Sequence, residues 1–119
     1  MFHMATSRLK DGQISQAIAD FKSSAEIKPQ PAINDGLGQC YHKLGEYDNA
    51  IKAFNSAIEA EPRNIEFLKN RSQCYFDMTW YQRSINDLAI ALDINDSDPQ
   101  VLYKQGLAFY AFGKYKKAI

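Results

Sequence analysis

The sequence repeats itself with a period of 34 residues, and this period constrains the fold more than any single motif does. The segment from Gly38 to Ile58 aligns with the segment 72–92, and the pattern resumes at Gly106. A weaker copy around Gly12 lies 33 residues before its counterpart. A repeat of this length is one supersecondary unit that buries its apolar face only by stacking on its neighbours. The sequence therefore predicts a stack of similar units.

Each unit contains two segments with helical periodicity. Between Tyr47 and Ile58, apolar residues are spaced by 3, 1, 3, 3 and 1 positions, which places them on one helical face and excludes strands. Leu37, Tyr41 and Leu44 form a second apolar face just before them. Each unit is therefore expected to be a hairpin of two helices.

Glycine and proline columns mark the helix ends. Gly45, with Gly113 in the last unit, stands where a left-handed C-cap would end the first helix and begin a tight turn. Pro29 and Pro62 follow the second helices. Thr79 replaces glycine, and because a β-branched residue resists positive φ, we expect its turn to differ in geometry. Small residues in two further columns predict close approach of the paired helices: Gly38, Ser72 and Gly106, then Ala17, Ala50, Ser84 and Ala118.

This layout resembles the tetratricopeptide repeat over nearly the whole chain. The matching series is Leu37-Gly38, Tyr41, Gly45, Tyr47, Ala50, Phe54, Ala57 and Pro62. The resemblance implies an all-α, right-handed α-solenoid of antiparallel helix-turn-helix units, whose first helices line a concave surface. It also implies one domain over residues 1–119 with about three and a half repeats, at approximately 1–30, 31–64, 65–98 and an incomplete 99–119.

Composition and charge narrow the functional classes. The chain holds 14 Lys and Arg against 14 Asp and Glu, and residues 31–98 alone carry six basic and eleven acidic side chains. That sign is wrong for a phosphate track, so we expect no nucleic-acid partner. The longest apolar runs, at 88–92 and 107–112, are far shorter than a bilayer span, and the first ten residues do not resemble a signal peptide. We expect a cytoplasmic protein that does not enter membranes.

The sequence contains no catalytic or metal-binding pattern. Cys40 and Cys74 share a repeat column, too far apart for a disulfide or a common zinc, and are interpreted as small buried hydrophobes. No carboxylate pair or His cluster has the spacing of an acid–base or nucleophilic site. We therefore predict a non-enzymatic protein without a cofactor, although a regulatory segment of an enzyme stays an alternative.

A partner-binding groove is predicted on the face of the first helices opposite the core stripe. A groove of this kind would hold an extended peptide or a helix, with polar contacts in the middle units and apolar anchors in the last. The alternative is that the aromatic residues of the last unit cover a neighbouring helix in a longer array. The predicted groove comprises Asp35, Gln39, Lys43, Lys69, Asn70, Gln73, Phe76, Asp77, Tyr103, Lys104, Leu107 and Tyr110.

The family resemblance also implies a specific ligand mode, the carboxylate clamp that binds acidic C-terminal tails of heat-shock chaperones. Asn70 matches a clamp asparagine, and Lys104 stands where the family has arginine. Asp35, Gln39 and Gln100 replace a lysine, an asparagine and a lysine, and an aspartate would repel a ligand carboxylate. A co-chaperone role is thus an alternative, as is a structural role in a large assembly, including a ciliary one.

Two surface features complete the expectations. Trp80, the only tryptophan, is expected to be partly exposed, either covering the Thr79 turn or contacting a partner at the edge. The last unit stops barely one turn into its second helix, which predicts underpacked apolar side chains at Phe109, Phe112 and Tyr115 and self-association through them. The same segment, 99–119, carries a net charge of +4.

Overall fold

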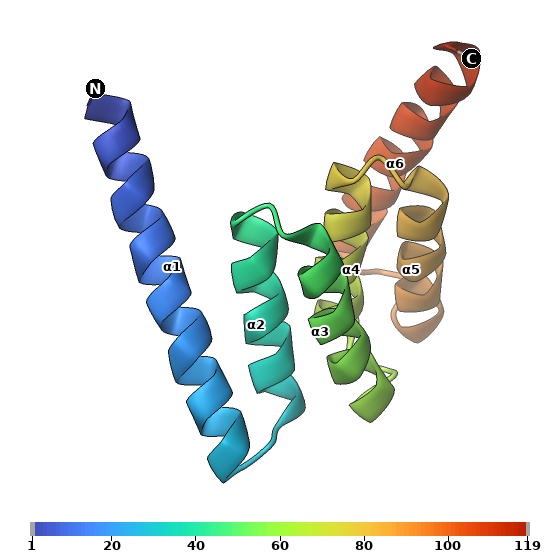
Figure 1. Ribbon diagram of the computed structural model, residues 1–119. Coiled ribbons are helices and arrows are strands. Elements are labelled where there is room, and N and C mark those ends of the chain that lie inside the picture. The colour runs from blue at the N-terminus through green and yellow to red at the C-terminus, as the bar shows by residue number, and fades with distance from the viewer. Residues whose placement is uncertain (1, 119) are drawn as a thin grey trace. The chain divides into compact units, whose positions relative to one another are not determined.

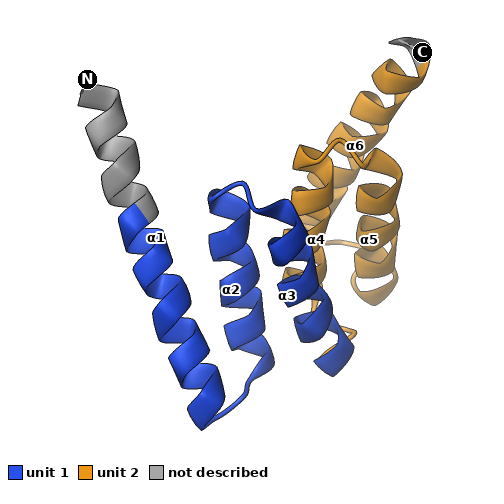
Figure 2. Cartoon of the chain, viewed as in Figure 1, with its two compact units in different colours: residues 1–60 blue, residues 61–119 orange. Residues whose placement is uncertain are grey.

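The computed structural model confirms the all-α fold class. It describes the backbone of residues 2–118 and the side chains of residues 12–116, and every regular element among them is a helix. The helices form two compact units, residues 1–60 with α1 to α3 and residues 61–119 with α4 to α6 (Figure 2). In chain order they are α1 (Phe2–Ile27), α2 (Pro31–Lys43), α3 (Tyr47–Ala60), α4 (Ile65–Asp77), α5 (Tyr81–Ile94) and α6 (Pro99–Ala118) (Figure 1).

In the first unit α2 packs against both α1 and α3. Ala50, Phe54 and Ala57 are completely buried, which confirms the apolar face predicted for α3. A Cβ added at Gly38 would lie 2.5 Å from the Phe54 ring, so only glycine lets this ring rest on the backbone of α2. The close approach predicted for the Gly38 column is confirmed here.

In the second unit α5 packs against both α4 and α6. The Ser84 hydroxyl donates a hydrogen bond to the Ser72 carbonyl at 2.9 Å, so the two small-residue columns meet directly between α4 and α5. The Ser72 hydroxyl in turn donates to the Lys69 carbonyl at 2.7 Å. Both serines are buried, and each hydroxyl donates a hydrogen bond, so the close packing leaves neither hydroxyl without a partner.

A buried ion pair also joins α4 to α5. Arg71 donates from Nε and Nη2 to the two carboxylate oxygens of Asp87, at 2.8 and 2.6 Å. The Asp87 side chain is only 4% exposed. Burial raises the pKa of Asp87, and the hydrogen bonds and charge of Arg71 offset this only in part. Neither residue belongs to a motif in the sequence.

The turn between α2 and α3 has the predicted left-handed cap. Gly45 has φ 79°. Its N–H donates to the His42 carbonyl at 3.0 Å, and the Glu46 N–H donates to the Tyr41 carbonyl at 2.9 Å. This pair of reversed hydrogen bonds is the Schellman motif.

The turn between α4 and α5 has the same geometry, so the prediction of a different turn at Thr79 is wrong. Thr79 has φ 66°, its N–H donates to the Phe76 carbonyl at 3.0 Å, and the Trp80 N–H donates to the Tyr75 carbonyl at 2.9 Å. The Trp80 ring stacks on the Tyr75 ring, with centroids 6.0 Å apart. These contacts hold threonine in a left-handed conformation that costs about 1–2 kcal/mol relative to its ordinary one.

Two helices end just before a proline, as predicted, but the last unit departs from the repeat pattern. α1 ends at Ile27 before Pro29, and α3 ends at Ala60 before Pro62. By contrast, α6 continues through Gly113, so the turn expected there is wrong, because continuing the helix satisfies the backbone amides internally. An added Cβ at Gly106 would have no neighbour within 4 Å, so the close approach predicted there is also wrong.

Candidate partner-binding surfaces

The first unit contributes three residues to the predicted groove, and their environments differ. Asp35 is buried, and its carboxylate accepts a hydrogen bond from Gln39 Nε2 at 2.7 Å. Gln39 and Lys43 are exposed on the same helix, α2. Asp35 therefore lies in the interior of the first unit, although helical spacing predicted that it lies on the open stripe.

Lys69 departs from the open stripe in the same way, in the second unit. Its side chain is buried, and Nζ donates to Gln100 Oε1 at 2.8 Å. Nζ also lies 2.8 Å from the Glu66 carboxylate and 3.9 Å from that of Asp98. Asp98 caps α6, accepting from the Gln100 N–H at 2.9 Å, so Lys69 ties α4 to the start of α6.

A second polar bridge joins α4 to α6 one turn further along. Lys104 Nζ donates to Gln73 Oε1 at 2.7 Å, and Gln73 Nε2 donates to Asp77 Oδ1 at 3.1 Å. Burial lowers the pKa of Lys104, and the charge of Lys69 lowers it further, while Asp77 and Glu66 oppose the shift. The two ammonium groups thus share one side of the unit and repel each other.

Beside these bridges, α6 presents a stripe of exposed apolar side chains. Tyr103 is 69% exposed, Leu107 42% and Tyr110 64%. At separations of four and three residues they lie on one face of the helix. The stripe borders a small hollow of about 50 Å³ between α4, α5 and α6. That hollow is lined by Ser72, Gln73, Phe76, Ser84, Lys104 and Leu107.

Trp80 and the last unit expose large apolar side chains. Trp80 is 47% exposed, which confirms its predicted partial exposure, and its stacking on Tyr75 supports the account in which it covers the turn. Phe109 and Tyr115 are 54% and 53% exposed, while Phe112 is half-buried. The apolar side chains of the last unit are thus underpacked as predicted, whereas self-association stays a prediction.

The two cysteines are free thiols. Cys74 is fully buried, and burial together with the charge of Asp77 raises its pKa to about 11. Cys40 is half-buried, and burial raises its pKa against the opposing charge of Lys43. Cys74 is the small buried hydrophobe that was predicted, and Cys40 is only partly so.

The described residues, 12–116 for side chains and 2–118 for the backbone, contain neither a metal site nor a membrane span. No group of three or more His, Cys, Asp or Glu side chains there is arranged to hold a metal ion. Within the same residues no helix has the length and apolar character needed to span a bilayer.

Known proteins resemble this chain in sequence and fold. Two tetratricopeptide repeat family models match residues 36–64 and 100–119. Serine/threonine-protein phosphatase 5 from Homo sapiens is 31% identical over 98 residues, which cover 82% of this chain and 18% of that protein. DnaJ homolog subfamily C member 3 from Bos taurus is 25% identical over 114 residues, covering 90% of this chain and 22% of that protein. The chain thus spans about a fifth of the length of these curated relatives.

A solved structure has the same fold with little sequence identity. It is described as the first TPR of Spaghetti (RPAP3) bound to the HSP90 peptide SRMEEVD. It superposes with a TM-score of 0.79 at 14% identity, covering 93% of this chain and 89% of that one.

Proposed function

The chain belongs to the tetratricopeptide repeat family, a family of protein-interaction modules, and from this premise we propose that it is a non-enzymatic scaffold binding a partner peptide or helix. The observation that carries the proposal is the exposed stripe of Tyr103, Leu107 and Tyr110 on α6, beside the Lys104–Gln73 bridge. Large apolar side chains in a row, next to satisfied polar groups, are what an interface of this kind requires.

The stripe sets the chemistry of the partner. Covering each of the three side chains withdraws apolar surface worth about 1–2 kcal/mol, so a partner needs at least two apolar anchors to bind usefully. Gln73 and Phe76 extend this surface on α4, within the second unit. Gln39 and Lys43 are exposed on α2 of the first unit, where they offer polar contacts of their own. Buried Asp35 and Lys69 act as supports rather than as contacts.

A peptide selection with matched variants tests this proposal. Peptides of about twelve residues are selected from a random display library on the immobilised protein, and their affinities are measured by fluorescence polarisation. Leu107→Ser is expected to weaken the selected peptides about tenfold, because one anchor site is lost. Ile90→Ser is the control, since Ile90 is 45% exposed, belongs to α5 and does not line the hollow beside the stripe. Equal losses for the two variants would show that the stripe is not the binding surface.

Binding of an acidic chaperone tail is the second candidate. Similarity to phosphatase 5 and to the peptide-bound fold supports it, as do Asn70 and Lys104 at matching positions. Against it, the clamp positions of α2 are occupied by Asp35 and Gln39, which hydrogen-bond each other. We expect no saturable binding of SRMEEVD at micromolar concentration. A micromolar affinity that Lys104→Ala abolishes would replace the first proposal with this one.

A further inference from the structure

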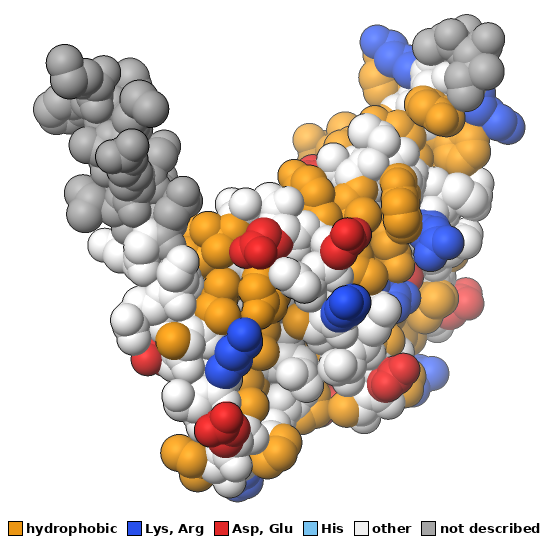
Figure 3. All heavy atoms as spheres, viewed as in Figure 1, with side chains coloured by type: hydrophobic (Ala, Val, Ile, Leu, Met, Phe, Trp, Pro, Cys, Tyr) orange, Lys and Arg blue, Asp and Glu red, His pale blue; other side chains and the backbone are white. Residues whose placement is uncertain are grey.

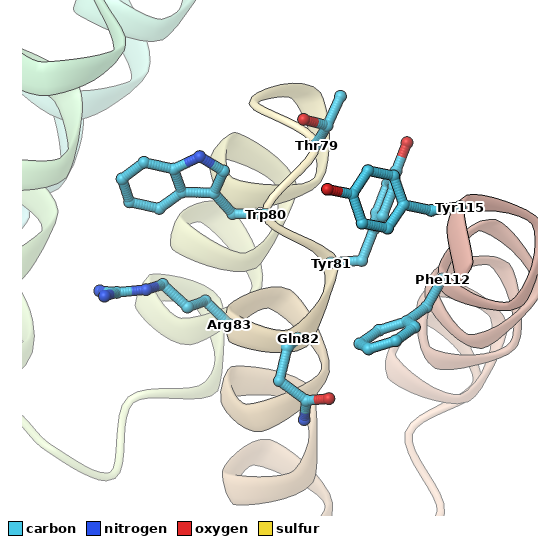
Figure 4. Close-up of a pocket in the computed structure, with 7 residues that line it drawn as sticks. All are labelled: Thr79, Trp80, Tyr81, Gln82, Arg83, Phe112 and Tyr115. Atoms are coloured by element: carbon cyan, nitrogen blue, oxygen red, sulfur yellow. The ribbon is translucent and has the colours of Figure 1, made fainter. Parts of the chain in front are cut away.

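A second hollow lies in the second unit at the seam between the start of α5 and the end of α6. Its volume is about 260 Å³. Figure 4 shows the rings of Tyr81, Phe112 and Tyr115 together on one side, with Trp80 and Arg83 pointing to the other. The lining residues are Thr79, Trp80, Tyr81, Gln82, Arg83, Phe112 and Tyr115. None of them belongs to the groove proposed above.

The floor of this hollow is aromatic and open. The Tyr81 and Tyr115 rings meet edge to face with centroids 6.2 Å apart, and Tyr81 meets Phe76 in the same way at 5.3 Å. Tyr115 is 53% exposed. An apolar cavity of roughly 150 Å³ holds a benzene molecule, so this hollow has room for one aromatic or branched aliphatic side chain.

The rim of the hollow is positively charged. Arg83 lies 5.1 Å from the centroid of the Trp80 ring, on the other side of the hollow from the aromatic floor. Lys116 lies 5.1 Å from the centroid of the Phe112 ring, just outside the lining residues. Among the described lining residues none is Asp or Glu. Residues 99–119 contain four lysines and no acidic residue, and Figure 3 shows Lys and Arg side chains beside hydrophobic ones at the end of α6 (upper right).

The start of α5 adds to this positive potential. Its N-cap, Trp80, makes no side-chain capping hydrogen bond, and no acidic residue occurs in its first turn. The first turn of α5 therefore supplies no carboxylate of its own to compensate the partial positive charge of the helix N-terminus.

From the aromatic floor and the cationic rim, we infer that this hollow docks an acidic segment of a partner protein through one aromatic or aliphatic side chain. The apolar anchor fills the hollow, and flanking carboxylates approach Arg83 and Lys116. Phe112 and Tyr115 fall on a different face of α6 from Tyr103 and Leu107. Tyr110 and Tyr115 line a common hollow with Thr79 and Tyr81, so the two surfaces adjoin at Tyr110. A nucleic acid is disfavoured because residues 31–98 carry eleven acidic against six basic side chains.

The test is an NMR titration of the ¹⁵N-labelled protein with two short peptides. One is Glu-Glu-Phe-Glu-Glu with blocked ends, and the other has alanine in place of phenylalanine. We expect the largest shifts at the amides of Tyr81 to Arg83 and of Phe112 to Tyr115. The phenylalanine peptide is expected to bind about tenfold more tightly, because only it fills the hollow.

Variants then separate the rim from the floor. Lys116→Glu is expected to weaken the phenylalanine peptide about threefold at low salt, through charge alone. Its matched control is Lys52→Glu, an exposed lysine on α3 whose reversal should leave the affinity unchanged. Tyr115→Ala is expected to remove the preference for phenylalanine over alanine, whereas Leu107→Ser should leave it intact.

Four results would overturn the inference. They are equal affinity for the two peptides, an affinity that Lys116→Glu leaves unchanged, displacement of the peptide by oligouridine, and shifts at the same amides that grow with protein concentration alone. The third would assign the hollow to nucleic acid and the fourth to a second copy of the chain. Loss of the peptide in Leu107→Ser would instead place it in the groove, which also refutes a separate site.

Discussion

Replacing Thr79 by glycine is expected to stabilise the protein, because the fold holds this threonine at φ 66°. A non-glycine residue in the left-handed region costs about 1–2 kcal/mol, and glycine removes that cost. Glycine also gives the unfolded chain more freedom, which takes back about 0.4–1 kcal/mol. The Thr79 side chain is exposed, so little burial is lost. The net expectation is a gain of about 0.5–1 kcal/mol in the free energy of unfolding.

Urea denaturation followed by Trp80 fluorescence and by circular dichroism measures this gain, and the unfolding temperature should rise by about 2–5 °C. The tryptophan adjoins the substituted residue, so its signal reports on the second unit. The matched control is Gly45→Thr at the equivalent turn of the first unit, where φ is 79° and the sign should reverse. If Thr79→Gly and Thr79→Asn both lower the free energy of unfolding, the left-handed conformation of Thr79 does not destabilise the protein, and the reasoning is refuted.

Three further outcomes follow from packing and charge. Gly38→Ala should lower the free energy of unfolding by about 2 kcal/mol or more, since its Cβ meets a phenylalanine ring at 2.5 Å, while Gly106→Ala, with open space around it, should raise it by about 0.5–1 kcal/mol; similar effects of the two in thermal denaturation would contradict this. Asp87→Asn should cost about 3 kcal/mol, because it removes the carboxylate charge that faces the half-buried Arg71 guanidinium, and replacing both by Met and Leu should cost less than that single change; urea titrations that rank the double variant as less stable would reject it. Burial raises the pKa of Cys74 from 9.0 to about 11, so the unfolded chain releases the thiol proton first, and stability present below pH 9 is lost as the pH rises through about 11; a Cys74→Ala variant with the same loss between pH 9 and 11 would show that other groups cause it.

The parts of the fold that depend on local spacing could be predicted from the sequence. The apolar positions between Tyr47 and Ile58 set a helical face, and Phe54 lies at its buried centre. Gly45 sits where a first helix must reverse, and its φ of 79° needs no tertiary support. Thr79 shows the limit of such reasoning, because residue preference argued against a turn that hydrogen bonds and the stacking of Trp80 enforce.

The polar residues of the groove could not be placed by helical periodicity, because their positions depend on partners in a neighbouring helix. A wheel assigns Lys69 to the open stripe, yet its long side chain reaches Gln100, 31 residues later. Arg71 reaches Asp87 across α4 and α5, 16 residues away, and no spacing rule within one helix links them. These contacts depend on how far a side chain reaches toward a packed neighbouring helix, and the residue spacing within one helix does not predict that.

Two of the contacts between helices, one made by Lys69 and one by Lys104, do follow from the repeat, and they limit what the surface can bind. Lys69–Gln100 and Gln73–Lys104 share a separation of 31 residues, three fewer than the period of 34. In the second unit, polar side chains of α4 and α6 that are 31 residues apart therefore pair with each other. A ligand carboxylate would have to break such a pair before it reached Lys104, and would leave an amide oxygen unsatisfied. The exposed tyrosines and Leu107 have no such competitor, so apolar anchors rather than charges should dominate recognition on this face.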